Sequence, residues 1–129
     1  AEAWQLSNAP VLMMAAHKAS LDLFAQTSMQ ALREKSLRLT GYLEFVLNTV
    51  AEMTIQEMEL ITPKDPAQRG CQISMRLKGR NKKVVTDLAA AGVIVDWREP
   101  DTIRLAPVPL YNSFEDVYRL GEILIGLLG

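Results

Sequence analysis

The sequence has little of several features that define protein classes. It has one cysteine, Cys71, so the 129-residue chain forms no internal disulfide, and we expect a reducing, cytoplasmic location. Fourteen basic residues against fifteen acidic ones give a net charge of −1, which offers no electrostatic case for binding nucleic acid or a membrane surface. No apolar run approaches the roughly 20 residues of a membrane span. The N-terminus lacks a signal-peptide pattern, and the length predicts one domain, residues 1–129.

The residues that usually carry chemistry are also scarce. The only histidine, His17, lies in an apolar segment and is predicted to be a packed or half-exposed helix residue. Cys71 heads an apolar strand pattern and is predicted to be inert core. The sequence has no Cys/His cluster for a metal and no glycine-rich phosphate loop. We therefore assign no catalytic residue and no metal ligand in this chain.

Residues 1–52 predict a helical leading segment. One helix is expected over residues 10–26, with Pro10 in its first turn, where a missing N–H costs nothing. Because it is rich in Ala, Met and Leu and has few charges, we expect it to be largely buried. A second, longer helix should start at Thr27 or Ser28. Its apolar stripe has steps of three and four residues, which is one helix face: Leu32, Ser36, Leu39, Leu43, Val46 and Val50.

Residues 53–129 predict a unit of sheet and helices. Strands are expected over residues 58–62, 71–77, 93–97 and 102–106, the last two joined in a hairpin through residues 98–101. A third helix should begin near Asn81 and end at Gly92. A last helix should follow Ser113, with Asp116 completing a capping box. The predicted fold class is α+β, with a small, mostly antiparallel sheet flanked by helices.

An arginine stands inside the last predicted strand, directly before two prolines. Pro107 and Pro109 exclude a regular central strand or helix after that point. A guanidinium fixed at a strand end beside a rigid turn can hold a carboxylate in bidentate geometry. Arg104 is therefore the candidate binding residue. The alternative from the residues alone is an ordinary strand arginine that points into water.

Several segments of the chain, in order, resemble the C-terminal part of kynureninases. They are WQLSN at 4–8, KSLRLTGYLE at 35–44, ITP at 61–63, QRGCQ at 68–72, DWREP at 96–100 and IRLAPVPLYNS at 103–113. The block over residues 69–72 and the block over residues 104–113 together are specific. The resemblance implies the C-terminal small domain of a pyridoxal-phosphate (PLP) enzyme of fold type I, related to class V aminotransferases.

The resemblance implies a function for a complete polypeptide. Kynureninases are PLP-dependent hydrolases that split L-kynurenine into anthranilate and L-alanine in the kynurenine pathway of tryptophan catabolism, which leads to NAD biosynthesis. A large PLP-binding domain of the same polypeptide and a homodimer are the implied partners. The sequence leaves open whether L-kynurenine or 3-hydroxykynurenine is preferred, because the residues that contact the ring lie mostly upstream.

The resemblance also implies roles for three residues. Arg104 matches the arginine that holds the α-carboxylate of the substrate, and Ser7 and Asn8 match a pair at the active site, with Asn8 also in the cofactor pocket. From the residues alone, Ser7 or Asn8 could instead cap the first helix, which is a common role for both residue types.

Two other functions stay open on the sequence. The chain could be a free-standing, non-catalytic α+β module that binds an amino acid or a protein partner, with Arg104 holding a free carboxylate. It could also be the small domain of another fold type I PLP enzyme, such as a desulfurase or an aminotransferase.

We expect the isolated chain to cleave no kynurenine and to form no Schiff base with PLP at one defined lysine. None of its lysines lies in a segment that resembles the family's Schiff-base lysine. Since lysines in proteins usually lie at the surface, we expect all six to be solvated: Lys18, Lys35, Lys64, Lys78, Lys82 and Lys83. Absorbance after incubation with PLP, followed by borohydride reduction and peptide mapping, measures this. Stoichiometric trapping at a single lysine would contradict it.

Overall fold

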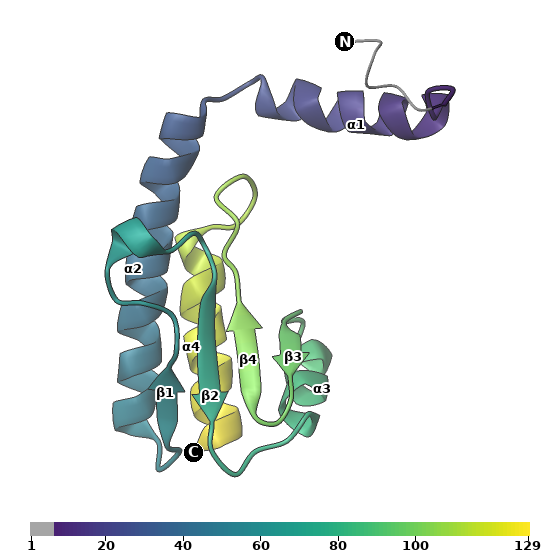
Figure 1. Cartoon of the computed structure of the whole chain (residues 1–129). Coiled ribbons are helices and arrows are strands. Elements are labelled where there is room, and N and C mark those ends of the chain that lie inside the picture. Colours follow the sequence, from purple (N-terminus) through teal and green to yellow (C-terminus); the bar gives the residue numbers. More distant parts are fainter. Residues whose placement is uncertain (1–6) are drawn as a thin grey trace. The chain divides into compact units, whose positions relative to one another are not determined.

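The computed structural model describes residues 7–129, and the described part contains four α-helices and one four-stranded sheet (Figure 1). The Trp4, Gln5 and Leu6 part of the first resembling segment lies outside the described residues. The predicted element order is confirmed. In chain order the elements are α1 (Val11–Phe24), α2 (Met29–Met53), β1 (Met58–Leu60), the short 3-10 helix η2 (Pro66–Gln68), β2 (Ile73–Leu77), α3 (Lys83–Ala90), β3 (Asp96–Arg98), β4 (Thr102–Leu105) and α4 (Phe114–Leu128).

The chain forms two compact units, Ala1–Leu32 and Arg33–Gly129. The sequence pattern places a division after residue 52, whereas the compact units divide inside α2. The physical reason is the apolar face of α2, which packs with the sheet in one core: Leu39, Leu43 and Val50 of α2 share a cluster with Ile73 and Ile103 of the strands. Most of α2 therefore belongs with the sheet.

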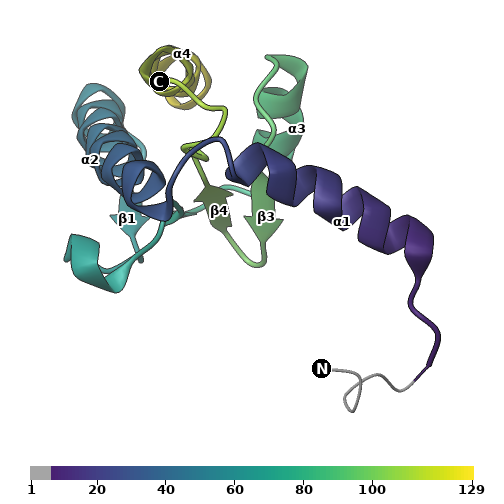
Figure 2. The same ribbon diagram turned by 90° about the horizontal axis from the view of Figure 1, so that it is seen from above.

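The sheet of the second unit is antiparallel throughout, as predicted, with strand order β1-β2-β4-β3. Helices α2, α3 and α4 lie on one face of this sheet (Figure 2). The third strand is shorter than the predicted 93–97 and begins at Asp96. Val93 lies instead at the C-terminal end of α3, where its backbone N–H donates to the Leu88 carbonyl at 2.9 Å. The predicted α+β class, a small sheet with helices, is confirmed.

The helix faces that form the core agree closely with the predicted stripe on α2. The buried residues of α2 are Ser36, Leu39, Thr40, Leu43, Val46, Leu47 and Val50. On α4 the buried residues include Val117, Leu120 and Leu124, whereas Phe114 and Tyr118 are 46% and 50% exposed. The capping box is present, since the Ser113 hydroxyl accepts from the Asp116 N–H and the Asp116 carboxylate accepts from the Ser113 N–H.

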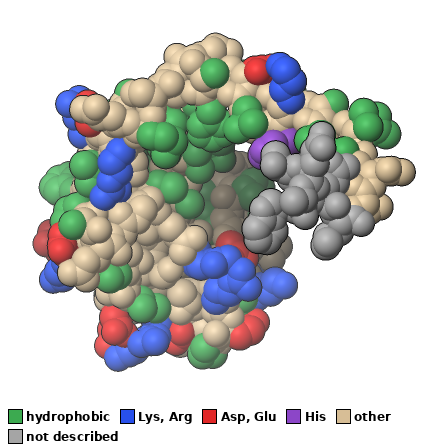
Figure 3. All heavy atoms as spheres, turned by 45° about the horizontal axis from the view of Figure 1, so that its top comes forward, with side chains coloured by type: hydrophobic (Ala, Val, Ile, Leu, Met, Phe, Trp, Pro, Cys, Tyr) green, Lys and Arg blue, Asp and Glu red, His purple; other side chains and the backbone are tan. Residues whose placement is uncertain are grey.

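Helix α1 corrects one prediction. It was expected to be largely buried, but none of its residues is buried, and Val11 and Leu12 are 72% and 87% exposed. His17 is exposed as well, rather than packed (Figure 3). The apolar composition did not produce burial because the first unit consists of little more than this one helix. Cys71 is also less buried than expected: it is half-buried and precedes β2 instead of heading it.

Gly121 marks the closest approach between α2 and α4. A Cβ atom added at Gly121 would lie 2.5 Å from Cγ1 of Val46, which is well inside the van der Waals contact of two non-bonded carbon atoms. The absence of a side chain therefore allows the two helices to pack together over the sheet. Gly126, one and a half turns further along α4, would meet nothing within 4 Å.

These two glycines form a matched pair of substitutions. We expect Gly121→Ala to destabilise the chain by about 0.5–2 kcal/mol, because overpacking against Val46 outweighs the roughly 1 kcal/mol gained in helix propensity. Gly126→Ala should stabilise it by about 0.5–1 kcal/mol, because only the propensity changes. Urea unfolding of the three chains measures both. Equal stabilisation by the two changes would refute close packing at Gly121.

Candidate functional site

Arg104 lies on the open face of the sheet. In β4 the side chains alternate: Ile103 and Leu105 are 0% and 2% exposed and face the helices, so Arg104 between them faces the other way. The Arg104 side chain is 32% exposed. No helix of the second unit covers this face (Figure 2). Arg104 is therefore neither a core residue nor a fully solvated one.

Asp96 of β3 holds the guanidinium of Arg104. The two residues lie directly opposite each other in the β3–β4 register. Arg104 Nε donates to Asp96 Oδ2 at 2.6 Å, and Arg104 Nη2 donates to the same oxygen. This hydrogen bonding, together with the charges of Arg104 and Arg98, holds the pKa of the Asp96 carboxyl below its usual value, although partial desolvation opposes it. Asp96 lies in the segment DWREP, but no local sequence pattern marks it as the partner of Arg104.

The rest of this face carries further charged side chains. Arg98 Nε lies 3.1 Å from the same Asp96 Oδ2, so two arginines share one carboxylate. On the neighbouring strands, Arg76 lies 2.6 Å from Glu59 and 3.4 Å from Asp101. The face is thus lined by paired charges rather than apolar residues, and it is chemically able to receive a carboxylate at an arginine.

Ser7 and Asn8 lie ahead of α1 and are exposed. The N-cap of α1 is Pro10, and no side chain forms a capping hydrogen bond there. The N-cap position is therefore taken by neither Ser7 nor Asn8, and Pro10 precedes the first helical residue instead of occupying the first turn. Ser7 and Asn8 belong to the first unit and Arg104 belongs to the second. Each residue is therefore described only by its surroundings within its own unit.

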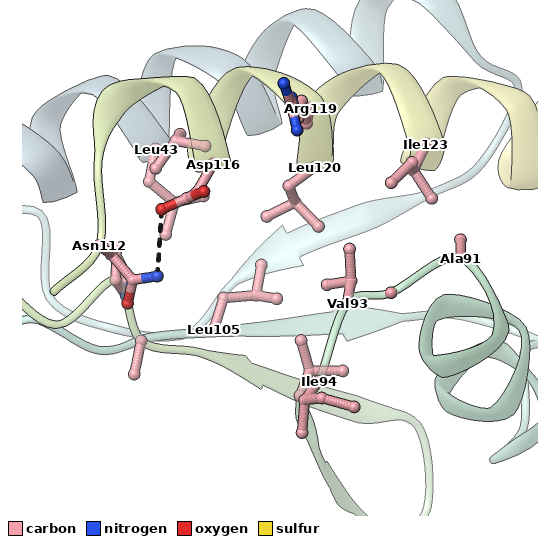
Figure 4. Close-up of a pocket in the computed structure, with 15 residues that line it drawn as sticks. Leu43, Ala91, Val93, Ile94, Leu105, Asn112, Asp116, Arg119, Leu120 and Ile123 are labelled. Carbon is pink, nitrogen blue, oxygen red and sulfur yellow. Dashed lines mark hydrogen bonds between the residues drawn. The ribbon is translucent and has the colours of Figure 1, made fainter.

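A hollow of the second unit lies on the opposite side of the sheet from Arg104. It is a cavity of about 450 Å³ between α4, β4 and the segment that follows α3. Leu105, Val93 and Leu120 point into it, and Asn112 and Asp116 stand at one end, joined by a 3.4 Å hydrogen bond (Figure 4). Because Leu105 and Arg104 point to opposite faces, this cavity cannot bring a ligand to Arg104.

Arg69, in the resembling block at residues 68–72, lies where its contacts stabilise the fold. Its side chain is only 6% exposed, and Nη2 lies 2.6 Å from Glu44 Oε2 on α2. Nη1 donates to the Pro63 carbonyl at 3.2 Å, while the buried Nε has no hydrogen-bond partner among the described residues. Arg33 of α2 donates to the Pro66 carbonyl at 2.5 Å. The two arginines fasten the loop 63–70 to α2, so this block serves the fold.

The described residues do not by themselves form a cofactor or metal site. PLP needs a lysine, an acidic partner for its ring nitrogen and phosphate donors. Every lysine here except the half-buried Lys35 is exposed, and Lys18, Lys78 and Lys83 each pair with an acidic side chain. No group of three or more His, Cys, Asp or Glu residues in the described part could hold a metal ion. Among residues 7–129, no helix combines the length and the apolar character needed to cross a membrane.

Comparison with known proteins covers nearly the whole chain. Residues 32–124 match the family profile described as kynureninase C-terminal domain. The kynureninase of Myxococcus xanthus (strain DK1622) is 52% identical over 126 residues, which is 98% of this chain and 29% of that protein. The kynureninase of Christiangramia forsetii is 50% identical over 124 residues, 96% of this chain and 29% of that protein. The kynureninase of Xanthomonas campestris pv. campestris (strain B100) is 52% identical over 125 residues, 95% of this chain and also 29% of that protein.

The buried pair of Arg69 and Glu44 yields a stability prediction. We expect Arg69→Ala to cost about 2–4 kcal/mol, somewhat below the range for fully buried pairs because Glu44 keeps 22% of its side-chain exposure. The loss comes from leaving the Glu44 carboxylate without its partner and the loop 63–70 without an anchor.

The control for Arg69 is Lys83→Ala, since Lys83 pairs with Asp87 on the surface of α3 and its side chain is 75% exposed. It should leave the unfolding midpoint almost unchanged, because exposed pairs contribute little. Urea denaturation of both variants measures the difference. If Arg69→Ala were as mild as Lys83→Ala, the structural role of Arg69 would be refuted.

Proposed function

Since this chain belongs to the kynureninase family, through its C-terminal domain, we propose that it supplies the substrate-carboxylate clamp of a PLP-dependent kynureninase. The chain spans about 29% of the length of the relatives it matches, and the activity is that of a complete polypeptide. The reaction would be hydrolytic cleavage of L-kynurenine to anthranilate and L-alanine. Cleavage of 3-hydroxykynurenine belongs to the same proposal.

One observation carries the proposal: Arg104 stands half-exposed on a sheet face that the helices of its own unit leave open. An arginine there can form two parallel hydrogen bonds to a carboxylate, which fixes the orientation of the substrate as well as its charge. Orientation matters because the bond to be broken must be aligned with the cofactor plane before reaction. The role of Arg104 is therefore to bind and orient, and no proton transfer is assigned to it.

The cofactor chemistry is assigned to the rest of the polypeptide. PLP acts as an electron sink when bound, but the described residues do not fit it alone, because none of their lysines is buried. We assign Asn8 to the cofactor pocket and Ser7 to the substrate side of the site, where an amide and a hydroxyl can donate to anionic groups. A cytoplasmic homodimer with the large PLP-binding domain in the same chain completes the proposal.

Arg104→Lys, in a complete polypeptide that carries this domain, tests the proposal. Lysine keeps the charge but loses the planar two-pronged donor set. We expect kcat/KM for L-kynurenine to fall roughly 30- to 1000-fold, corresponding to about 2–4 kcal/mol for a charge-assisted bidentate contact. The PLP absorbance and its titration should stay nearly normal, because Arg104 is assigned to the substrate.

The matched control is Arg119→Lys, which alters an arginine of α4 that pairs with Glu115 and is 68% exposed. It should leave kcat/KM unchanged. If Arg104→Lys were equally silent, Arg104 would be an ordinary strand arginine and the proposed clamp would fail. If Arg104→Lys abolished PLP binding, the assignment of Arg104 to the substrate would be wrong.

A further inference from the structure

We propose that Asp96 is a positioning residue for the carboxylate clamp: it fixes the plane of the Arg104 guanidinium so that one edge of it is presented to the substrate. This inference rests on the proposed function and adds a residue to it. Asp96 and Arg104 are cross-strand partners in the β3–β4 register, which places their side chains on the same face of the sheet. The backbone therefore holds the two groups together before any ligand arrives.

The way Asp96 binds Arg104 leaves a usable edge. A guanidinium has five N–H donors in a fixed planar arrangement. Asp96 accepts from Nε, at 2.6 Å, and from Nη2, and both bonds end on the single oxygen Oδ2. The pair thus occupies the side edge of the guanidinium and does not use Nη1. The end edge formed by Nη1 and Nη2 keeps the two-pronged geometry that suits a second carboxylate.

The local charge favours an incoming anion. Arg98 Nε lies 3.1 Å from the same Oδ2, so two guanidinium groups share one carboxylate and leave one unit of positive charge at the site. The depressed pKa of Asp96, caused first by its hydrogen bond with Arg104, keeps the carboxylate ionised through the neutral range. Asp96 consequently orients Arg104 without cancelling the charge that attracts the substrate.

If the pair of Asp96 and Arg104 served only to stabilise the fold, removing the Asp96 charge would lower the thermal unfolding midpoint. The exposure of the pair argues against that role. Asp96 and Arg104 keep 48% and 32% of their side-chain exposure, and exposed ion pairs contribute little to stability. Removing the Asp96 charge should therefore hardly shift the thermal unfolding midpoint, while it frees the guanidinium to rotate. A large effect on substrate binding with a small effect on unfolding separates positioning from folding.

The test is Asp96→Asn in a complete polypeptide that carries this domain. We expect kcat/KM for L-kynurenine to fall roughly 10- to 100-fold, mainly through KM, because a hydrogen bond to a charged group is lost and the clamp loses its orientation. Asp96→Glu, which restores the carboxylate on a longer stem, should recover part of the loss. The affinity for a kynurenine analogue without the α-carboxylate should not change.

The matched control is Glu59→Gln. Glu59 is also an acidic strand residue on this face and also pairs with an arginine, Arg76, directly opposite in the β1–β2 register. It has no contact with Arg104 in the described structure, and its variant should keep the normal kcat/KM.

A double-mutant cycle decides whether Asp96 acts through Arg104. In the Arg104→Lys background, Asp96→Asn should cause little further loss, since the group that it orients is gone. Losses that multiply, normal kinetics in Asp96→Asn, or tighter substrate binding in that variant would overturn the inference. Silence of Arg104→Lys alone would instead overturn the proposed clamp, so the two failures are distinguishable.

Discussion

The alternation of side chains along β4 is the constraint on which both the core and the candidate site depend. Successive residues of a strand point to opposite faces, so Ile103 and Leu105 can be buried under the helices only if Arg104 points away from them. A slip of one residue in pairing would bury the arginine and expose the two apolar residues. The free energy that fixes the core therefore also fixes which face of the sheet carries Arg104.

Arg69 and Arg104 each donate to a carboxylate at 2.6 Å, yet their surroundings differ, and burial accounts for the difference. Arg69 is 6% exposed and spends its donors on Glu44 and a loop carbonyl, so it holds the loop 63–70 in place. Arg104 is 32% exposed, and its bonds to Asp96 take only one edge. A buried arginine whose donors are used within the fold stabilises the fold. An arginine that is held along only one edge of its guanidinium keeps donors that can bind a further carboxylate.

Helix α1 illustrates the limit of reasoning from composition. Its Ala, Met and Leu content is typical of a buried helix, and in the described structure every residue of it is exposed. Composition measures how much a helix gains from burial, but burial also requires a surface to pack against. The apolar faces of α2 and α4 pack against the sheet, and Gly121 allows these two helices to approach each other closely.

The sequence by itself determined the order of elements, the antiparallel α+β class, the buried stripe of α2, the capping box at Ser113 and the place of Arg104 inside the last strand. These are local properties, set by periodicity of three to four residues in helices and two in strands. Only the tertiary structure decided the partner of Arg104. The predicted hairpin loop, residues 98–101, would have paired Asp96 with Ile103, whereas Arg98 in fact pairs with Thr102 and brings Asp96 opposite Arg104. That register depends on the turn geometry and on packing against the helices, which involve residues distant in sequence, and no local pattern records it.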